Sequence, residues 1–203
     1  VDMLLKKSSF SQSHNVAVRG GSDKTQYLFS MGYFGQEGIF KIGSDNTKRY
    51  NARMNVNTKL NDIFSLDSRI SYSQMHTFNP SDDISEDYGL FMNIYQLGSS
   101  YPIYLPNSDN TKYARTNSGP KTYQILKDGG YGEETRRNLD GLFTLKAENF
   151  IRNLSLRLIY SPQLYFLDFD SFDKTISFYD IGPEPARYLF NPNGISKTRS
   201  LQA

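Results

Sequence analysis

Acidic side chains form the densest group of possible metal ligands in this sequence. The segment DFDSFD brings Asp168, Asp170 and Asp173 close together along the chain, and calcium prefers several oxygen ligands of this kind. The segment lacks the spaced glycine and the bidentate glutamate of an EF-hand loop. We therefore interpret it as a solvated loop, with calcium binding by the three aspartates as the secondary reading.

The two histidines of the chain, His14 and His76, could serve as metal ligands or as catalytic bases. As ligands they would need further donors at suitable spacing, and the sequence offers none. As bases they would need a nucleophile and a carboxylate beside them, as in an outer-membrane phospholipase. Both fall at the ends of segments in which apolar and polar residues alternate, and an interfacial position explains them better than either role. We expect no enzymatic activity and no cofactor.

The glycine pairs and the carboxylate pairs also lack a catalytic context. Gly20-Gly21 and Gly129-Gly130 are not followed by the lysine and serine or threonine that open the helix of a phosphate-binding loop. Adjacent carboxylates at 82–83, 86–87 and 133–134 fall in predicted surface loops. No buried neighbour there would make one carboxyl an acid and the other a base, so we interpret all three pairs as solvated.

The elements that position these residues are strands, because apolar and polar residues alternate with a period of two. In the segment 48–60, Met54 and Val56 fall on one face. Arg49 and Arg53 fall on the opposite face. We predict strands near 14–20, 25–35, 48–60, 64–76, 137–149 and 154–166, with Pro162 distorting the last one.

Most charges inside these strands fall on the polar face, namely Arg19, Arg49, Arg53, Asp67, Arg69, Asp140, Lys146, Glu148 and Arg157. A lysine or arginine facing lipid near mid-membrane costs roughly 2–4 kcal/mol, whereas one facing a hydrated lumen costs little. The pattern therefore predicts an all-β fold, namely about six antiparallel strands of a transmembrane β-barrel. The candidates for lining its lumen or contacting a substrate are Arg49, Arg53, Asp67, Arg69 and Arg157, although mixed charges that simply hydrate the lumen are the simpler reading.

Short and long connections alternate along the chain. Tight turns are predicted at Gly20–Lys24, Asn61–Ile63 and Phe150–Asn153, whereas one loop spans about 77–136. Short turns on one side and long loops on the other are typical of outer-membrane barrels. Ser81 is placed to cap a short helix in the long loop. The loop aromatics Tyr88, Phe91, Tyr95, Tyr101 and Tyr104 could stack on sugar rings or pack the loop against a neighbouring domain.

Composition narrows the class of protein further. Hydrophobic residues make up 37% of the chain and aromatic residues 14%, which fits strands that are apolar on one face and argues against disorder. Cysteine is absent, so disulfides and thiolate metal sites are excluded. A net charge of +2 with mixed signs gives no indication of a nucleic-acid partner.

Four blocks of the sequence resemble one family. HNVAVRGGSDKTQYLFSMGYFGQEGIF (14–40) and KRYNARMNVNTKLNDIFSLDSRISYS (48–73) resemble the first barrel hairpins of SusC/RagA-like TonB-linked (TonB-dependent) outer-membrane transporters. YPIY (101–104) and GGYGEETRRNLDGLFTLKAENFIRNLSLRLIYS (129–161) fit the same pattern. The resemblance therefore covers nearly the whole chain.

The resemblance implies a location, a role and partners. Members of this family are 22-stranded barrels in the outer membrane of Gram-negative bacteria. They are energised through TonB and paired with a SusD-like surface lipoprotein. They import glycans, oligosaccharides or oligopeptides. Residues 1–203 would be part of the barrel domain, and the plug domain and TonB box would lie outside them.

A soluble β-sandwich or a lipocalin-like binding module is the alternative, because period-two strands alone allow either one. The many charges on the second face argue against it, since a sandwich core cannot hold unpaired charges.

Overall fold

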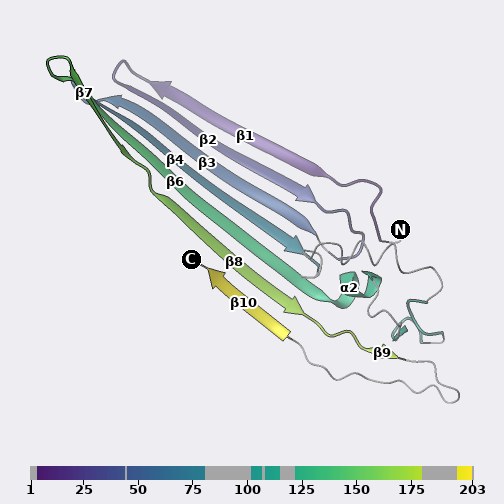
Figure 1. Cartoon of the computed structure of the whole chain (residues 1–203). Helices are drawn as coiled ribbons and strands as arrows, with labels where there is room; N and C mark the ends of the chain where they lie inside the picture. Colours follow the sequence, from purple (N-terminus) through teal and green to yellow (C-terminus); the bar gives the residue numbers. More distant parts are fainter. Residues whose placement is uncertain are drawn as a thin grey trace.

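One long antiparallel sheet dominates the computed structural model, which describes residues 4–43, 45–80, 102–106, 108–114, 122–179 and 196–202. Its main path runs in the order β1-β2-β3-β4-β6-β8-β10, with β7 also paired to β6 (Figure 1). The strands are β1 (Ser11–Gly21), β2 (Thr25–Glu37), β3 (Asn46–Lys59), β4 (Phe64–Asn79), β6 (Gly130–Ile151), β7 (Leu154–Tyr160), β8 (Gln163–Asp173) and β10 (Ser196–Gln202). The fold is therefore all-β, as the sequence predicts.

Two small elements complete the described fold. A parallel pair joins β5 (Tyr113–Ala114) to β9 (Phe178–Tyr179). The helix α2 (Thr122–Asp128) directly precedes β6. The sequence predicts neither the pair nor this helix, and the helix predicted to start at Ser81 lies outside the described residues. None of the helices in the described ranges is long and apolar enough to cross a membrane.

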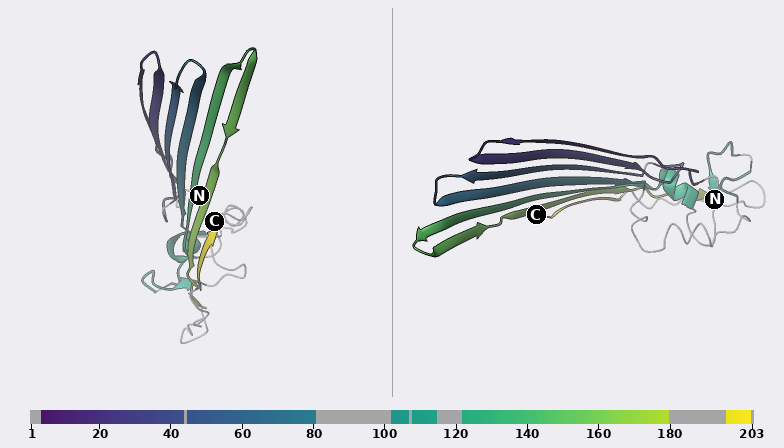
Figure 2. Two further views of the ribbon diagram at one scale, coloured as in Figure 1. Left: turned by 90° about the vertical axis from the view of Figure 1, so that its left-hand side faces the viewer. Right: turned by 90° about the horizontal axis from the view of Figure 1, so that it is seen from above.

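The two ends of the sheet differ in character. At one end, strands are joined by the short connections 22–24, 60–63 and 152–153, where Asn153 adopts a left-handed conformation with φ 63°. At the other end lie α2, β5 and β9 (Figures 1 and 2). The predicted alternation of short turns and longer excursions is therefore present in the described part of the chain.

The distortion predicted at Pro162 separates β7 from β8 without changing their register on β6. Phe143 pairs with Tyr160 in β7, and Asp140 pairs with Gln163 in β8, so the register is the same on both sides of the break at Ser161 and Pro162. The backbone N–H of Gly141 still donates to the carbonyl of Pro162 at 2.8 Å. Proline lacks an N–H, so only its carbonyl can join the ladder.

Several strands run further toward the α2 end than the sequence pattern predicts. β6 begins at Gly130, where we predicted a loop, and β8 continues to Asp173. The carboxylate pair 133–134 and the segment 168–173 therefore lie in strands, and their interpretation as solvated loops is wrong. The physical reason is cross-strand pairing: β6 lies between β4 and β8, and Arg137 of β6 forms an ion pair with Asp168 of β8.

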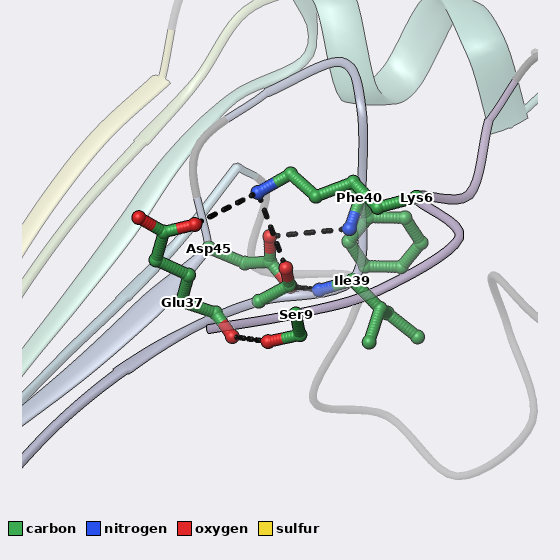
Figure 3. Close-up of polar contacts among 7 residues, drawn as sticks. Lys6, Ser9, Glu37, Ile39, Phe40 and Asp45 are labelled. Atoms are coloured by element: carbon green, nitrogen blue, oxygen red, sulfur yellow. Dashed lines mark hydrogen bonds and ion pairs between the residues drawn. The ribbon is translucent and has the colours of Figure 1, made fainter. Parts of the chain in front are cut away.

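A small hydrophobic core ties the loops together at this end. Phe40, Ile125 and Leu126 are buried, so the β2–β3 connection packs against α2. Asp45 holds that connection in shape, because its carboxylate accepts hydrogen bonds from the backbone N–H groups of Ile39 (2.9 Å) and Phe40 (3.4 Å) (Figure 3). The loop end of the sheet is thus a packed layer, and the turn end has no counterpart among the described residues.

Candidate functional site

One face of the sheet carries exposed apolar side chains on the strands from β1 to β8. The register places Val18, Phe29, Met54 and Ile70 side by side in one row across β1 to β4. Val18, Phe29 and Met54 are 54%, 42% and 40% exposed. A soluble monomer rarely exposes a contiguous apolar patch of this kind. The other large exposed residues of this face are Val16, Tyr27, Met31, Tyr50, Leu139, Leu154, Leu156, Leu158, Tyr160, Leu164 and Phe166.

Aromatic rings border this apolar face toward the loop end. The ring of His14 stacks on that of Tyr33 at a centroid distance of 6.2 Å, and Tyr33 lies 5.2 Å from Tyr50. Aromatic girdles at the two membrane interfaces are a property of transmembrane barrels. The position of His14 in this row supports its interpretation as an interfacial residue.

Beyond the aromatic row, the same face becomes charged. His76 lies 2.5 Å from Glu133, and Arg137 forms an ion pair with Asp168. A second aromatic row follows, in which Phe78 stacks on Tyr131 at 5.8 Å. The apolar zone is therefore bounded, and the strands continue past it into a polar layer near the loops.

The opposite face carries the predicted lumen residues. Arg49, Arg53, Asp67 and Arg69 all share this face by register, because β3 and β4 pair along one ladder. Arg69 donates two hydrogen bonds to Asp67, at 3.2 and 3.1 Å. Arg49 lies over the ring of Phe34, with 5.5 Å between the guanidinium carbon and the ring centroid. These side chains gather on one surface, as the alternation predicts.

Arg157 lies apart from this group. It belongs to β7, near the turn end, and pairs in register with Lys146. Two neighbouring cations repel each other, so this corner of the polar face differs in charge from the region around Arg69.

An open hollow of about 710 Å³ lies on the polar face over β2, β3, β4 and β6. Its lining includes Arg53, Asp67, Arg69, Ser71 and Asp140. A second hollow of about 330 Å³ extends from Arg53 and Ser71 toward Asn51 and Ser73. The sequence places Asp140 on the polar face of its strand but does not single it out as a site residue.

A row of short amide and hydroxyl side chains also escapes the sequence analysis. Asn15, Gly32, Asn51, Ser73 and Asn138 are aligned across β1, β2, β3, β4 and β6. A Cβ at position 32 would lie 2.5 Å from Oδ1 of one neighbouring asparagine and 2.6 Å from that of the other. The glycine lets the two amides approach each other over the backbone. Aligning the hairpins from their turns would have revealed this row.

Of the predicted loop aromatics, Tyr104 is the one that the structure describes; Tyr88, Phe91, Tyr95 and Tyr101 lie outside the described residues. Tyr104 stacks on Tyr113 at a centroid distance of 5.0 Å. The ammonium of Lys127 on α2 donates to the Tyr104 hydroxyl at 2.9 Å. Tyr104 therefore packs within the loop layer through its ring and its hydroxyl.

The pKa values of the two stacked tyrosines, Tyr104 and Tyr113, are shifted in opposite directions. Burial raises the pKa of Tyr113, and its hydrogen bond to the carboxylate of Asp128 raises it further. Burial also opposes ionisation of Tyr104, but the hydrogen bond from Lys127 and contacts with two tyrosine hydroxyls outweigh it, so the pKa of Tyr104 is lowered. The same hydrogen bond raises the pKa of Lys127.

The calcium candidates do not converge. Asp168 and Asp170 point to one face of β8, whereas Asp173 belongs to the alternate parity. Within the described ranges, no group of three or more acidic or histidine side chains could hold a metal ion.

The fold class is therefore an antiparallel β-sheet with one exposed apolar face and one polar face. The chain is similar to chains of the RagAB peptide importer. The likeness to its closed-closed state has a TM-score of 0.59 at 18% identity and covers 85% of this chain. For the open-open state the TM-score is 0.54 at 20% identity, with the same coverage.

These likenesses show the fold alone, because the identities are low. The chain spans 19% of the length of each matched chain. No protein-family model matches the sequence, and no curated protein does.

Proposed function

We propose that this chain is part of the β-barrel wall of an outer-membrane transporter that imports large nutrients. The observation that carries the proposal is the uncharged outward face. From Leu139 to Ala147 of β6, and on the paired residues of β4 and β7, the face toward the exposed apolar side holds no charged side chain. That stretch agrees with the roughly 9–11 residues of a tilted spanning strand.

The polar face is the lumen side in this proposal. Placing Arg53 or Arg69 against lipid instead would cost roughly 2–4 kcal/mol for each charge near mid-membrane. Facing a wide aqueous lumen, the same residues stay hydrated. Within the stretch from Leu139 to Ala147 and its paired residues, the segregation of charge between the two faces is therefore what a barrel wall requires.

The mode of transport is proposed from the sequence resemblance and the fold likeness together. The barrel is energised through TonB by a segment outside these residues, and a SusD-like lipoprotein covers its outer mouth. The similar structures are of a peptide importer, which supports oligopeptides as cargo, and glycans are the other substrate class of the resembling family.

The test is the mass and location of the native polypeptide that carries this sequence. Digestion of membrane and soluble fractions, followed by peptide mass spectrometry on the intact band, gives both. We expect a chain several times longer than 203 residues, extracted from the outer membrane with detergent together with a surface lipoprotein. A chain of about 203 residues in the soluble fraction would overturn the proposal and favour a β-sandwich.

A further inference from the structure

We propose that the polar face holds a binding site for the two opposite charges of a short peptide, formed by Arg53 of β3 and Asp140 of β6. The inference rests on the proposed function, because it takes the polar face as the surface that cargo meets. It goes further by selecting peptides over neutral glycans.

The register brings the two residues into one row. Arg53 pairs with Ser71 of β4, and Ser71 pairs with Asp140. Because the serine side chain is short, Ser71 leaves open space between the cation of Arg53 and the anion of Asp140. All three residues line the hollow of about 710 Å³.

Within the described part of the sheet, neither Arg53 nor Asp140 is neutralised by a neighbouring side chain. Among the residues that the structure describes, Arg53 and Asp140 take part in none of the ion pairs, whereas Arg69 and Asp67 in the same hollow bind each other at 3.1 Å. A ligand that brings a carboxylate to Arg53 and an ammonium to Asp140 would form two charge-assisted hydrogen bonds, which are stronger than neutral ones.

The neighbouring row suits a peptide backbone. Asn51, Ser73 and Asn138 lie one row closer to the loops, on the same face. An asparagine amide offers both a donor and an acceptor, which matches the alternating N–H and C=O groups of an extended peptide. Sugar hydroxyls could also bind here, but they would leave both charges of the first row without a partner.

The spacing fits a short peptide. Arg53 and Asp140 are separated by two strand intervals of about 4.8 Å, or about 10 Å in all. An extended chain spans roughly 3.3–3.6 Å per residue. About three residues therefore bridge the two charges, with the peptide lying across the strands.

The experiment compares two forms of one tripeptide on the full native protein in detergent. Tri-alanine with free termini carries both charges, and its N-acetylated, C-amidated form carries neither. We expect wild type to bind the free form at least tenfold more tightly. Arg53→Gln and Asp140→Asn should each reduce a tenfold preference to about threefold, because one of the two charges remains, with capped-peptide binding unchanged.

Two further variants sharpen the test. Arg53→Asp combined with Asp140→Arg should restore the preference, because the peptide can bind in the reverse direction. Arg19→Gln on β1 is the control, since it removes the same charge from the polar face at a residue outside both the row and the hollow. It should keep the wild-type preference, and the heat-modifiable mobility of each variant reports its folding.

Three results would overturn the inference. The first is a wild-type protein that binds both forms equally. The second is a loss of affinity in Arg53→Gln that is the same for both forms, which would mean that the charges hold another protein segment. The third is binding of an uncharged trisaccharide in preference to either peptide. The third result leaves the transport function intact, whereas absence of the native chain from the outer membrane would remove both proposals.

Discussion

The phenol of Tyr27 on β2 covers the backbone of Gly20 on β1. A Cβ at position 20 would lie 2.5 Å from the Tyr27 hydroxyl oxygen and 2.8 Å from the ring carbon that bears it. Gly20 and Tyr27 are register partners beside the tight turn that joins the two strands. The ring occupies the space that a side chain would take, so the hairpin depends on both residues together.

We expect Gly20→Ala to destabilise the protein by about 1 kcal/mol, because the ring of Tyr27 must move. Tyr27→Ala removes the ring and should destabilise it as well. The double variant should cost less than the two single changes added together, since the clash is then absent. Denaturant unfolding of the four proteins in detergent measures the coupling, and strict additivity would contradict the packing described here.

A charge on the apolar face should be far more costly than one on the polar face. Met54→Arg places a guanidinium among the exposed apolar residues of β3, next to Phe29 and Ile70. We expect a loss of roughly 2–4 kcal/mol if this face meets lipid. Asn55→Arg, one residue further along and on the opposite face, is the control and should change stability by less than about 1 kcal/mol. Equal effects would count against a lipid-facing surface.

The β2–β3 connection should depend on the carboxylate of Asp45. Asp45→Ala removes the carboxylate that accepts from the backbone N–H groups of Ile39 and Phe40. Because water can reach these groups, we expect a cost of about 0.5–1.5 kcal/mol. We expect faster cleavage within 38–45 by an added protease. Asp23→Ala, in the β1–β2 turn, is the control for removing a loop carboxylate. Unchanged cleavage in Asp45→Ala would show that the buried Phe40 alone holds the connection.

The contribution of Tyr113 to the stability of the loop layer should fall in alkaline solution. Because the pKa of Tyr113 is raised in the folded protein, its contribution is complete below the ordinary tyrosine value of about 10. It is lost as the pH rises from there toward the folded pKa, since the unfolded chain releases its proton first. Hydrogen exchange of 104–114 between about pH 9 and 11 measures this loss, and Asp128→Asn should weaken the pH dependence by removing one cause of the shift.

The sequence predicts strands well where apolar and polar residues alternate, and poorly where glycine and charged residues dominate. Along β3 the alternation of Met54 and Asn55 is enough to assign both faces, since the side-chain period of a strand is fixed at two. The segment before Asn138 reads as a loop because glycine and charged residues crowd it. Its strand forms because β4 and β8 supply partners on both sides, and a single sequence does not reveal those partners directly.

The residues of the candidate site also differ in how far the sequence alone predicts them. Arg53 is predictable, because its charge stands out on a polar face. Asp140 and Asn51 gain meaning only when strands are aligned in register, and one residue of error would move them to the other face. The buried contact of Phe40 with α2 joins distant segments and has no periodic signal at all.

Strand β1 ends the sheet with every side chain from Ser11 to Arg19 exposed. Its outer edge presents a row of backbone donors and acceptors without a described neighbour, and it contains no proline to interrupt pairing. Such an edge is a template for adding another strand. Expressed by itself, this chain would therefore tend to aggregate by pairing β1 edges of neighbouring molecules. Inclusion bodies would then arise from the unpaired backbone groups of β1 in a sheet that has already formed.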